Sequence, residues 1–329
     1  METTSTPPAS DRIRVTSELG PEDLAVARAV LTAAAVDDGR DAVSEAGRLR
    51  IRDGAGRPGV RHLLQTVDGR PAGYAQLESA EDGGRATAEC AVHPELRGKG
   101  LGGRLVRAVL DEAAALRTGQ GAVDVDFWAH GGHPAAARLA ARYGGELVRE
   151  LRQMRRPSEV VPPEPVLPAG VGLRTFRPGE DDAAWQRLNA LAFAHHPEQG
   201  AWTQADLADR LAEPWFDPAG FFLAVRGDEP VGFHWTKVHP DGLGEVYVVG
   251  VAPTEQGGGL GKALTAAGLR HLILDRKVPA VLLYVDADNP AAVRVYEKVG
   301  FTVHEVDLMY RVRRVAGGPR PAAAVRPQG

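Results

Sequence analysis

Residues 245–261 read EVYVVGVAPTEQGGGLG, an apolar strand that runs into a glycine-rich turn. The valines between positions 246 and 251 favour a strand. Apolar residues then recur at i, i+3, i+4 and i+7 from Leu260 to Ala267, which predicts an amphipathic helix that starts near Gly259. A strand that leads into a glycine-rich helix start presents several backbone N–H groups beside the positive end of the helix dipole. The stretch therefore predicts a site for phosphate oxygens.

The spacing of this loop excludes two common phosphate-binding motifs. A dinucleotide loop needs G-x-G-x-x-G directly after the strand, and a Walker A loop needs G-x4-G-K-[ST]. Here Gln256 stands at the first position and Ala263 follows Lys262, so neither pattern fits. The remaining pattern, Q/R-x-x-G-x-G/A, resembles the pyrophosphate loop of the GNAT acyltransferases, a family that uses acetyl-CoA.

A second segment strengthens this resemblance. After an apolar strand at 281–285, residues 289–301 read NPAAVRVYEKVGF. They resemble the GNAT segment N-x-x-A-x-x-x-Y-x-x-x-G-F, which opens a helix. The alternative is a purely structural strand–helix unit with a glycine at the end of the helix.

Length and composition indicate two ordinary globular domains. The chain has 329 residues, 43% hydrophobic and 25% charged, and typical domains have about 150 residues. The net charge of −4 gives no reason to expect nucleic-acid binding. The single cysteine, Cys90, excludes an intramolecular disulfide and fits a reducing compartment. The start of the chain has no leader-like pattern and no apolar run approaches the length of a membrane span, so we expect a cytoplasmic protein without membrane contact.

The chain contains an internal repeat. Residues 93–102 read HPELRGKGLG, a second copy of the phosphate loop, and residues 133–138 (HPAAAR) echo residues 289–294 (NPAAVR). We therefore expect an α/β (α+β layered) protein with two tandem GNAT folds, each a mixed central β-sheet flanked by helices. Five prolines between the two copies favour an extended linker. The expected divisions are a disordered tail at 1–10, an N-terminal domain at 11–154, the linker at 155–170, a C-terminal catalytic domain at 171–316 and a disordered tail at 317–329.

The two copies differ where chemistry is expected. Alignment of the phosphate loops places Ala86 opposite Glu245, and alignment of the two echoing helices places Ala140 opposite Tyr296. The N-terminal copy therefore lacks both side chains that could move protons. We expect it to bind CoA without catalysing.

Acetyl transfer to an amine needs a base for the amine and a proton for the departing thiolate. Glu245 opens the strand before the loop, where a carboxylate can take the amine's proton directly or through water. Tyr296 lies on the helix that follows Asn289 and can protonate the sulfur. Gly250 interrupts a β-branched run, which suggests a bulge whose N–H groups face the thioester oxygen. The structural alternatives are a charge at a strand start for Glu245 and a core tyrosine for Tyr296.

Along nearly its whole length, the chain resembles the mycothiol synthase family of tandem GNAT enzymes. The resemblance rests on residues 193–200 (FAHHPEQG), 234–240 (HWTKVHP), 244–251 (GEVYVVGV) and 282–286 (LLYVD). It implies acetylation of the cysteinyl amine of Cys-GlcN-Ins (desacetylmycothiol) with acetyl-CoA, giving mycothiol and CoA in the last step of mycothiol biosynthesis. An unperturbed α-amine has a pKa of about 7.7–8.0, so a modest base is enough to neutralise it.

By position, the resemblance also implies three groups of binding residues. Those implied to contact the acceptor are Glu45, Glu198, Lys237, Glu245 and Tyr284. Those implied to hold the catalytic acetyl-CoA are Val249, Gly250, Val251, Gln256, Gly257, Gly258, Gly259, Leu260, Gly261, Lys262, Asn289, Pro290, Ala291, Ala292, Val293 and Arg294. Those implied to hold a second acetyl-CoA are Cys90, Ala91, Val92, Gly98, Lys99, Gly100, Leu101, Gly102 and Gly103.

One departure from the family pattern concerns the second phosphate loop. Family members usually carry arginines where this chain has Gly257-Gly258, so charge-assisted contacts are lost and Lys262 or Arg294 must compensate if affinity is kept. His195 and His196 have no partners at metal-ligand spacing, so we expect no metal site. We expect a monomer.

Two other functions stay open at this point. The first is a tandem GNAT that acetylates another amine, such as an aminoglycoside or a protein N-terminus. The second is a non-catalytic acyl-CoA sensor, which the presence of Glu245 and Tyr296 disfavours because a sensor needs neither.

Overall fold

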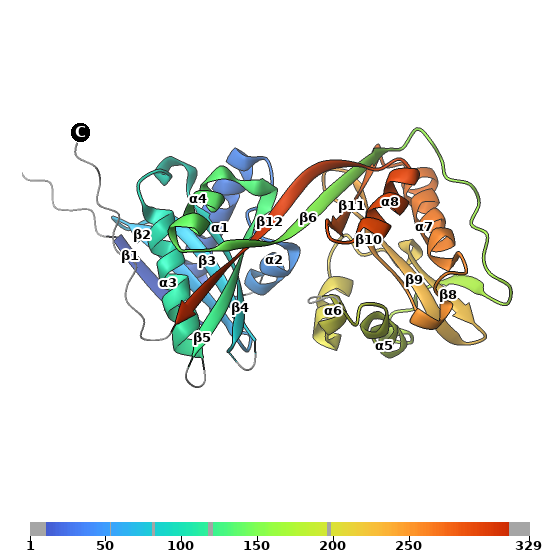
Figure 1. Cartoon of the computed structure of the whole chain (residues 1–329), viewed down its shortest axis with the longest axis horizontal. Coiled ribbons are helices and arrows are strands. Elements are labelled where there is room, and N and C mark those ends of the chain that lie inside the picture. Colours follow the sequence, from blue (N-terminus) through green and yellow to red (C-terminus); the bar gives the residue numbers. More distant parts are fainter. Residues whose placement is uncertain (1–10, 53, 81–82, 118–120, 196–198, 316–329) are drawn as a thin grey trace, which may run out of the picture. The chain divides into compact units, whose positions relative to one another are not determined.

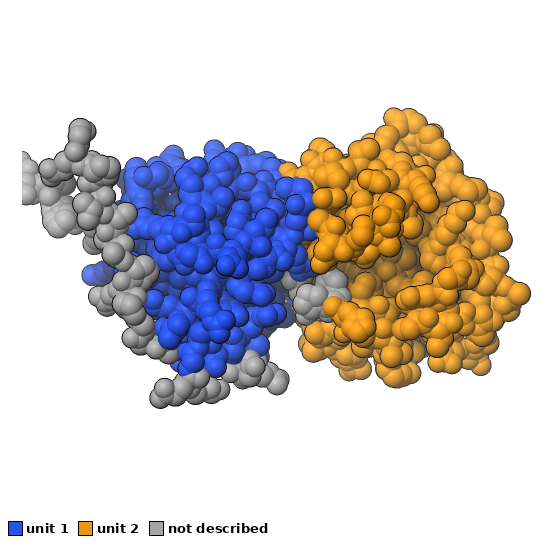
Figure 2. All heavy atoms as spheres, viewed as in Figure 1, with its two compact units in different colours: residues 1–150, 306–329 blue, residues 151–305 orange. Residues whose placement is uncertain are grey.

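The computed structural model describes residues 11–52, 54–80, 83–117, 121–195 and 199–315 (Figure 1). They form two compact units (Figure 2): unit 1 combines parts of 1–150 and 306–329, and unit 2 spans 151–305. Each unit contains one of the two phosphate loops.

Unit 1 is a mixed sheet flanked by helices, with strand order β1-β2-β3-β4-β5-β12. Strands β4 and β5 run parallel, and the other neighbours are antiparallel. Leu63 packs with helix α3 and Leu64 with helix α1, because successive strand residues face opposite sides of the sheet. The elements are β1 (Asp11–Thr16), α1 (Pro21–Asp38), α2 (Glu45–Ile51), β2 (Val60–Val67), β3 (Arg70–Ser79), β4 (Arg85–Val92), α3 (Leu101–Leu116), β5 (Ala122–Ala129), α4 (Pro134–Arg142) and part of β12 (Thr302–Val315).

Unit 2 repeats this plan, with strand order β6-β11-β10-β9-β8-β7 and a parallel pair, β10 and β11. Val246 packs on the α7–α8 side of the sheet, whereas Trp235 packs against Trp185 of α5 on the other side. The elements are β6 (Glu146–Pro157), β7 (Gly172–Thr175), α5 (Asp182–Ala192), α6 (Gln204–Leu211), β8 (Phe221–Arg226), β9 (Glu229–Val238), β10 (Gly244–Val251), α7 (Leu260–Arg270), β11 (Ala280–Asp286) and α8 (Pro290–Lys298). The expected class, two mixed sheets flanked by helices, is confirmed.

The last strand of each half belongs to the other unit. Most of β6, which ends the first half of the chain, pairs with β11 in unit 2. Most of β12, which ends the second half, pairs with β5 in unit 1 (Figure 1). The sequence predicted two domains separated by a linker at 155–170. The compact units differ from this division because each includes most of the last strand of the other half of the chain. Residues far apart in the chain make these pairs, so local sequence patterns carry no sign of them.

An ion pair between a half-buried arginine and a buried aspartate joins β12 to β5 within unit 1. The guanidinium of Arg311 donates from Nε and Nη2 to the two carboxylate oxygens of Asp126, at 2.7 and 2.8 Å. Asp126 is 4% exposed, and its partner lies 185 residues away in the sequence. A bidentate pair of this kind also specifies strand register, because a shifted strand would leave the buried carboxylate without its partner.

We expect the substitution Arg311→Ala to lower the free energy of unfolding by about 3 kcal/mol, because it leaves the Asp126 carboxylate buried and unpaired. Urea denaturation measures the change. Arg313→Ala on the same strand is the matched control: its side chain is 74% exposed, 3.9 Å from Asp124, and we expect a cost below about 1 kcal/mol. The double variant Asp126→Ala/Arg311→Ala should recover part of the loss. Equal costs for Arg311→Ala and Arg313→Ala would contradict this account.

Candidate active site

The two glycine-rich loops have the same backbone shape. In unit 2, Gly257 and Gly259 have φ of 83° and 86°, and α7 begins at the next residue, Leu260. In unit 1, Gly98 and Gly100 have φ of 77° and 82°, and α3 follows. Such φ values strain every residue with a Cβ atom, which explains the glycines. Neither N-cap glycine has a side chain to satisfy the first helical N–H groups, so these donors face outward at both helix starts.

The first side chain of each loop binds back to the preceding strand. Gln256 Nε2 donates to the carbonyl oxygen of Val251 at 3.3 Å, and Arg97 Nε donates to that of Val92 at 3.1 Å. Arg97 also pairs with Asp38, at 2.7 and 2.8 Å. These side chains hold the loop in place, which leaves backbone N–H groups as the main donors for a bound anion.

Each loop follows a pair of parallel strands that separate. In unit 2, β10 pairs with β11 from Gly244 to Val246, and the pairing ends there although β10 continues to Val251. In unit 1, β4 pairs with β5 from Arg85 to Glu89 and continues to Val92. The predicted triplets 249–251 and 90–92 therefore both lie beyond the last paired residue, where backbone groups on that side lack a strand partner.

The register places several predicted acceptor residues on one face of the unit 2 sheet. Glu245 lies opposite Lys237 on β9 and beside Leu282 on β11, so all three side chains share a face. Tyr284, two residues beyond Leu282, faces the same way. Helices α5 and α6 pack on this face, through Trp185 and Leu207. Glu245, Lys237 and Tyr284 thus lie on the same face of the unit 2 sheet.

The predicted bulge at Gly250 is wrong, because the irregularity lies at Tyr247. Val246 pairs with Thr236 and Val248 with Trp235, so Tyr247 is the extra residue, and Gly250 pairs regularly with Phe233. A Cβ atom at Gly250 would lie 2.7 Å from the ring of Phe233. Close packing against Phe233 explains why residue 250 is a glycine. The bulge at Tyr247 could not be predicted from the sequence because it depends on the register with β9.

Glu245 is nearly buried and has a histidine partner. Its side chain is 7% exposed, and its Oε2 lies 2.6 Å from Nε2 of His239, whose side chain is 25% exposed. His239 was not predicted as a site residue from the sequence. The only available signal was its place directly after β9, a few residues before Glu245 across a tight turn.

Two buried cations lie on aromatic rings of this face. The Nζ of Lys237 is 4.6 Å from the centroid of the Trp215 ring and 5.2 Å from that of Tyr247. The guanidinium of Arg210 lies 3.7 Å from the Trp202 ring, and its Nε donates to the Tyr247 hydroxyl at 2.7 Å. Attraction between cation and ring stabilises both charges where little water reaches them.

The remaining predicted residues of unit 2 lie on β11 and α8. The Tyr284 hydroxyl accepts a hydrogen bond from Gln153 Nε2 at 2.9 Å. The side-chain oxygen of Asn289 caps α8 by accepting from the N–H of Ala292 at 3.1 Å, so Asn289 shapes this helix start. Tyr296 packs edge-on against Phe301, and burial raises the pKa of its hydroxyl, which therefore keeps its proton at neutral pH.

The acetyltransferase (GNAT) family model matches residues 31–147 and 185–301. The chain belongs to the acetyltransferase (GNAT) family. It is therefore an acyltransferase that uses acetyl-CoA, with one GNAT match in each half.

Curated proteins similar to this GNAT chain cover it almost completely. It is 61% identical over 287 residues to the mycothiol acetyltransferase of Streptomyces griseus subsp. griseus, with 86% of this chain and 90% of the relative covered. It is 52% identical over 305 residues to the mycothiol acetyltransferase of Thermobispora bispora, with 91% and 99% covered.

Solved structures show the same fold. A GCN5-related N-acetyltransferase from Sphaerobacter thermophilus matches with a TM-score of 0.66 and 26% identity, covering 94% of this chain and 98% of that one. A tandem GNAT protein from the clavulanic acid biosynthesis pathway has a TM-score of 0.71 at 18% identity, covering 94% and 100%. The latter likeness concerns the fold alone.

The GNAT copy in unit 1 has Ala86 and Ala140, both buried, at the positions aligned with Glu245 and Tyr296. It nevertheless holds a carboxylate–histidine cluster that was not predicted from the sequence. Glu89 accepts from the N–H of Ser44 at 2.6 Å and from Gln76 Nε2 at 2.7 Å, and its Oε1 lies 2.8 Å from His130 Nε2. Both carboxylate oxygens are thus occupied.

The charges in this cluster stabilise one another. Burial disfavours the His130 imidazolium, but hydrogen bonds to Asp307 and Glu89 outweigh it and raise the pKa of His130 to about 10. Burial also opposes ionisation of Glu89, but His130 and the Ser44 N–H outweigh it and lower the pKa of that carboxyl. Asp307 belongs to β12, so the cluster joins β4, the start of α2 and the exchanged strand within unit 1.

The remaining residues named from the sequence lie in unit 1 or outside the described residues. Glu45 is half-buried at the start of α2, directly after Ser44. Cys90 packs against the α3 core, and burial, with the neighbouring Glu89, raises the pKa of its thiol to about 12, so it is a poor nucleophile. Glu198 and His196 lie outside the described residues.

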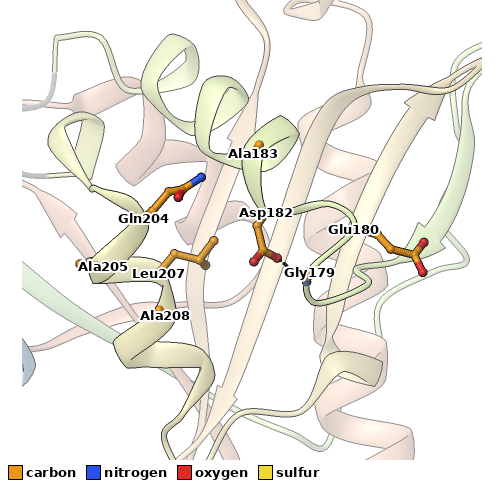
Figure 3. Close-up of a pocket in the computed structure, with 8 residues that line it drawn as sticks. All are labelled: Gly179, Glu180, Asp182, Ala183, Gln204, Ala205, Leu207 and Ala208. Atoms are coloured by element: carbon orange, nitrogen blue, oxygen red, sulfur yellow. Dashed lines mark hydrogen bonds between the residues drawn. The ribbon is translucent and has the colours of Figure 1, made fainter.

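A surface pocket of about 480 Å³ lies between the starts of α5 and α6 (Figure 3). Asp182, Gln204 and Leu207 contribute to its lining, and Asp182 accepts a hydrogen bond from the N–H of Gly179. The lining includes none of the predicted catalytic or binding residues. Among the described residues, no cluster of three or more His, Cys, Asp or Glu side chains could hold a metal ion. In the same part of the chain, no helix has the length and apolar character needed to cross a membrane.

His234 is fully buried beneath α7, and its Nδ1 donates to the carbonyl oxygen of Leu264 at 2.7 Å. Burial lowers its pKa to about 4, below the ordinary value of about 6.5. Its contribution to stability is therefore complete above pH 6.5 and is lost as the pH falls toward 4, because only the unfolded state takes up the proton. The loss approaches about 3 kcal/mol at pH 4.

We expect the variant His234→Asn, whose amide can still donate to Leu264, to lose less stability than the unaltered protein between pH 6.5 and 4.5. Denaturant unfolding at a series of pH values measures this slope. His304→Asn, which alters an exposed histidine, is the matched control and should keep the original slope. An unchanged slope in His234→Asn would show that another group controls the acid sensitivity.

Proposed function

We propose that the protein acetylates the cysteinyl amine of Cys-GlcN-Ins (desacetylmycothiol) with acetyl-CoA, which yields mycothiol and CoA. The observation that carries this proposal is the 61% identity, over 86% of the chain, to a protein named mycothiol acetyltransferase. The described geometry supports it, because the buried carboxylate of Glu245 and the acceptor residues Lys237 and Tyr284 share one face of the sheet. Action as a cytoplasmic monomer belongs to the same proposal.

The acetyl-CoA site of unit 2 lies along β10, the glycine loop and the start of α8. Residues 249–251 offer backbone groups beyond the end of strand pairing to the amides of the pantetheine arm. Residues 256–262 offer uncapped N–H groups at the start of α7 to the pyrophosphate, and residues 289–294 flank the same molecule. Two glycines at 257 and 258 leave this loop without cationic side chains there, so exposed Lys262 and Arg294 supply the nearby charge.

Glu245 and Tyr296 are the residues that transfer protons in unit 2. An α-amine with a pKa near 7.7–8.0 is mostly protonated at neutral pH and must lose a proton to attack the thioester. Glu245 provides the base function on the acceptor face, and Tyr296 supplies a proton to the departing thiolate from a hydroxyl that burial keeps protonated. Backbone N–H groups of 249–251 stabilise the developing oxyanion.

The acceptor is a pseudo-disaccharide whose hydroxyls suit charged hydrogen-bonding groups. Lys237 is held by two aromatic rings, so its ammonium is positioned before the acceptor arrives. We assign acceptor contacts in unit 2 to Lys237, Tyr284 and Glu245.

A second acetyl-CoA in unit 1 is part of the proposal. Its loop matches that of unit 2 in backbone shape, and residues 90–92 also lie beyond the end of strand pairing, so residues 90–92 and 98–103 would hold it. Catalysis there is disfavoured for two reasons. Ala86 and Ala140 replace the proton-moving side chains, and the nearby Glu89 carboxylate is already occupied.

The first test is CoA release from acetyl-CoA with Cys-GlcN-Ins, offered beside simple amines and aminoglycosides. We expect fast release with Cys-GlcN-Ins alone, and a loss of about 10²–10⁴-fold in Glu245→Gln, which keeps the shape of the side chain but cannot accept a proton. Lys237→Met should raise the Michaelis constant for the acceptor far more than that for acetyl-CoA. Preferred release with another amine would refute the acceptor assignment, and no release with any amine would favour a sensor.

The second test is the stoichiometry of acetyl-CoA binding, measured by calorimetry. We expect two sites in the unaltered protein and one in Gly100→Val, because a β-branched residue cannot adopt the φ of 82° that shapes the unit 1 loop. Gly69→Val is the matched control, since Gly69 has a φ of 75° in the β2–β3 turn of the same unit, outside the loop. A single site in the unaltered protein would refute binding in unit 1.

A further inference from the structure

In the contact between His239 and Glu245, the imidazole donates the hydrogen bond and the carboxylate accepts it. Glu245 is nearly buried, with 7% of its side chain exposed, whereas 25% of the His239 side chain is exposed. An ionised carboxylate only accepts hydrogen bonds, so at the 2.6 Å separation the proton between them belongs to Nε2 of His239. In the neutral ring, Nδ1 then carries the lone pair. The more exposed member of the pair is therefore the one that presents a basic nitrogen.

A tight turn fixes His239 in this place. Its N–H donates to the carbonyl oxygen of Leu243 at 2.8 Å, and its carbonyl oxygen accepts from the N–H of Gly242 at 2.9 Å. Gly242 has a φ of 86°, and Asp241 Oδ1 accepts from the N–H of Leu243 at 3.0 Å. These bonds close the β9–β10 connection and hold the imidazole against the first residues of β10. Among the described residues, none hydrogen-bonds to Nδ1 of His239.

We propose that Glu245 and His239 work as a carboxylate–imidazole pair in which Nδ1 of His239 receives the amine's proton, directly or through water. The inference rests on the proposed function and specifies how the base in that site works. Glu245 holds Nε2–H, selects the tautomer and stabilises the imidazolium that forms. The N–H bond of the amine breaks and leaves its electron pair on nitrogen, the Nδ1–H bond forms, and the imidazolium later returns this proton to water.

Base strength favours the imidazole as the final proton acceptor. In model compounds an imidazole has a pKa of about 6.5 and a carboxyl group about 4.3, against about 7.7–8.0 for an α-amine. Proton transfer is most effective when donor and acceptor are closely matched. A buried carboxylate that orients a more exposed imidazole satisfies this condition, and the same division of roles operates in serine hydrolases.

Other charged and titratable groups face this pair from neighbouring elements. Lys237 lies opposite Glu245 in the β9–β10 register, with its ammonium directed to the Trp215 and Tyr247 rings. Asp241 occupies the turn and is engaged with Leu243, and the Tyr284 hydroxyl on β11 accepts from Gln153. None of these groups hydrogen-bonds to Nδ1 of His239.

The decisive variant is His239→Gln, assayed by CoA release with the full chain and Cys-GlcN-Ins. Its amide nitrogen can still donate to Glu245, but it cannot take up a proton. We expect kcat to fall by about 10²-fold or more, the Michaelis constant for acetyl-CoA to stay within about 2-fold, and the acid limb of the pH profile of kcat to disappear. His304→Gln, an exposed histidine in unit 2, is the matched control and should keep the original kcat and pH profile.

Chemical rescue separates proton transfer from a merely structural role. Added imidazole should restore part of the activity of His239→Ala and should leave His304→Ala unchanged. A His239→Gln variant with the original kcat and pH profile would overturn the pair and leave Glu245 as the sole base. If His239→Gln does not fold, judged by its thermal transition, failure of imidazole to rescue a folded His239→Ala would overturn it equally. Failure of the proposed function is distinguishable, because the unaltered protein would then release no CoA with Cys-GlcN-Ins.

Discussion

The early end of pairing between two parallel strands is the constraint on which the site depends. Beyond Val246, β10 leaves β11 but keeps its antiparallel partner β9, so one side of 247–251 lacks a strand partner. Backbone amides exposed in this way need hydrogen-bond partners, and an extended ligand with amide groups can supply them. The glycine loop at the end of β10 then meets the start of α7. One strand thus joins the proposed base, the proposed thioester position and the proposed phosphate site.

The two units show how a duplicated fold comes to differ in chemistry. Both keep glycines with positive φ at the helix start, so both keep the same backbone shape there. In unit 1 the parallel pairing extends to Glu89 and β4 pairs with β3 without a bulge, whereas in unit 2 the bulge at Tyr247 accompanies an earlier separation. The unpaired segment at the end of the strand is therefore shorter in unit 1. The buried carboxylate of Glu89 in unit 1 hydrogen-bonds to Ser44, Gln76 and His130.

The buried cations on the face of the unit 2 sheet that packs against α5 and α6 are stabilised mainly by aromatic rings. Lys237 and Arg210 lie on Trp215, Tyr247 and Trp202. Placing charges in a site with little water is costly unless each has such partners, and it makes their fields act strongly on a bound molecule. The rings therefore hold the cationic side chains in place before the proposed acceptor binds. Binding then costs less side-chain conformational entropy.

The features that depend on neighbouring residues could be predicted from the sequence. Glycines at 257 and 259 specify their loop because only glycine adopts positive φ freely. The run of valines predicted β10, hydrophobic periodicity predicted α7, and the resemblance of residues 289–301 to a GNAT segment predicted α8. The features that depend on strand register and on pairing between distant residues could be seen only in the tertiary structure. The bulge lies at Tyr247 because β9 sets the pairing, and the place of β12 follows from contacts such as Arg311–Asp126, 185 residues apart. The His239–Glu245 contact likewise requires a turn and a register that no local pattern encodes.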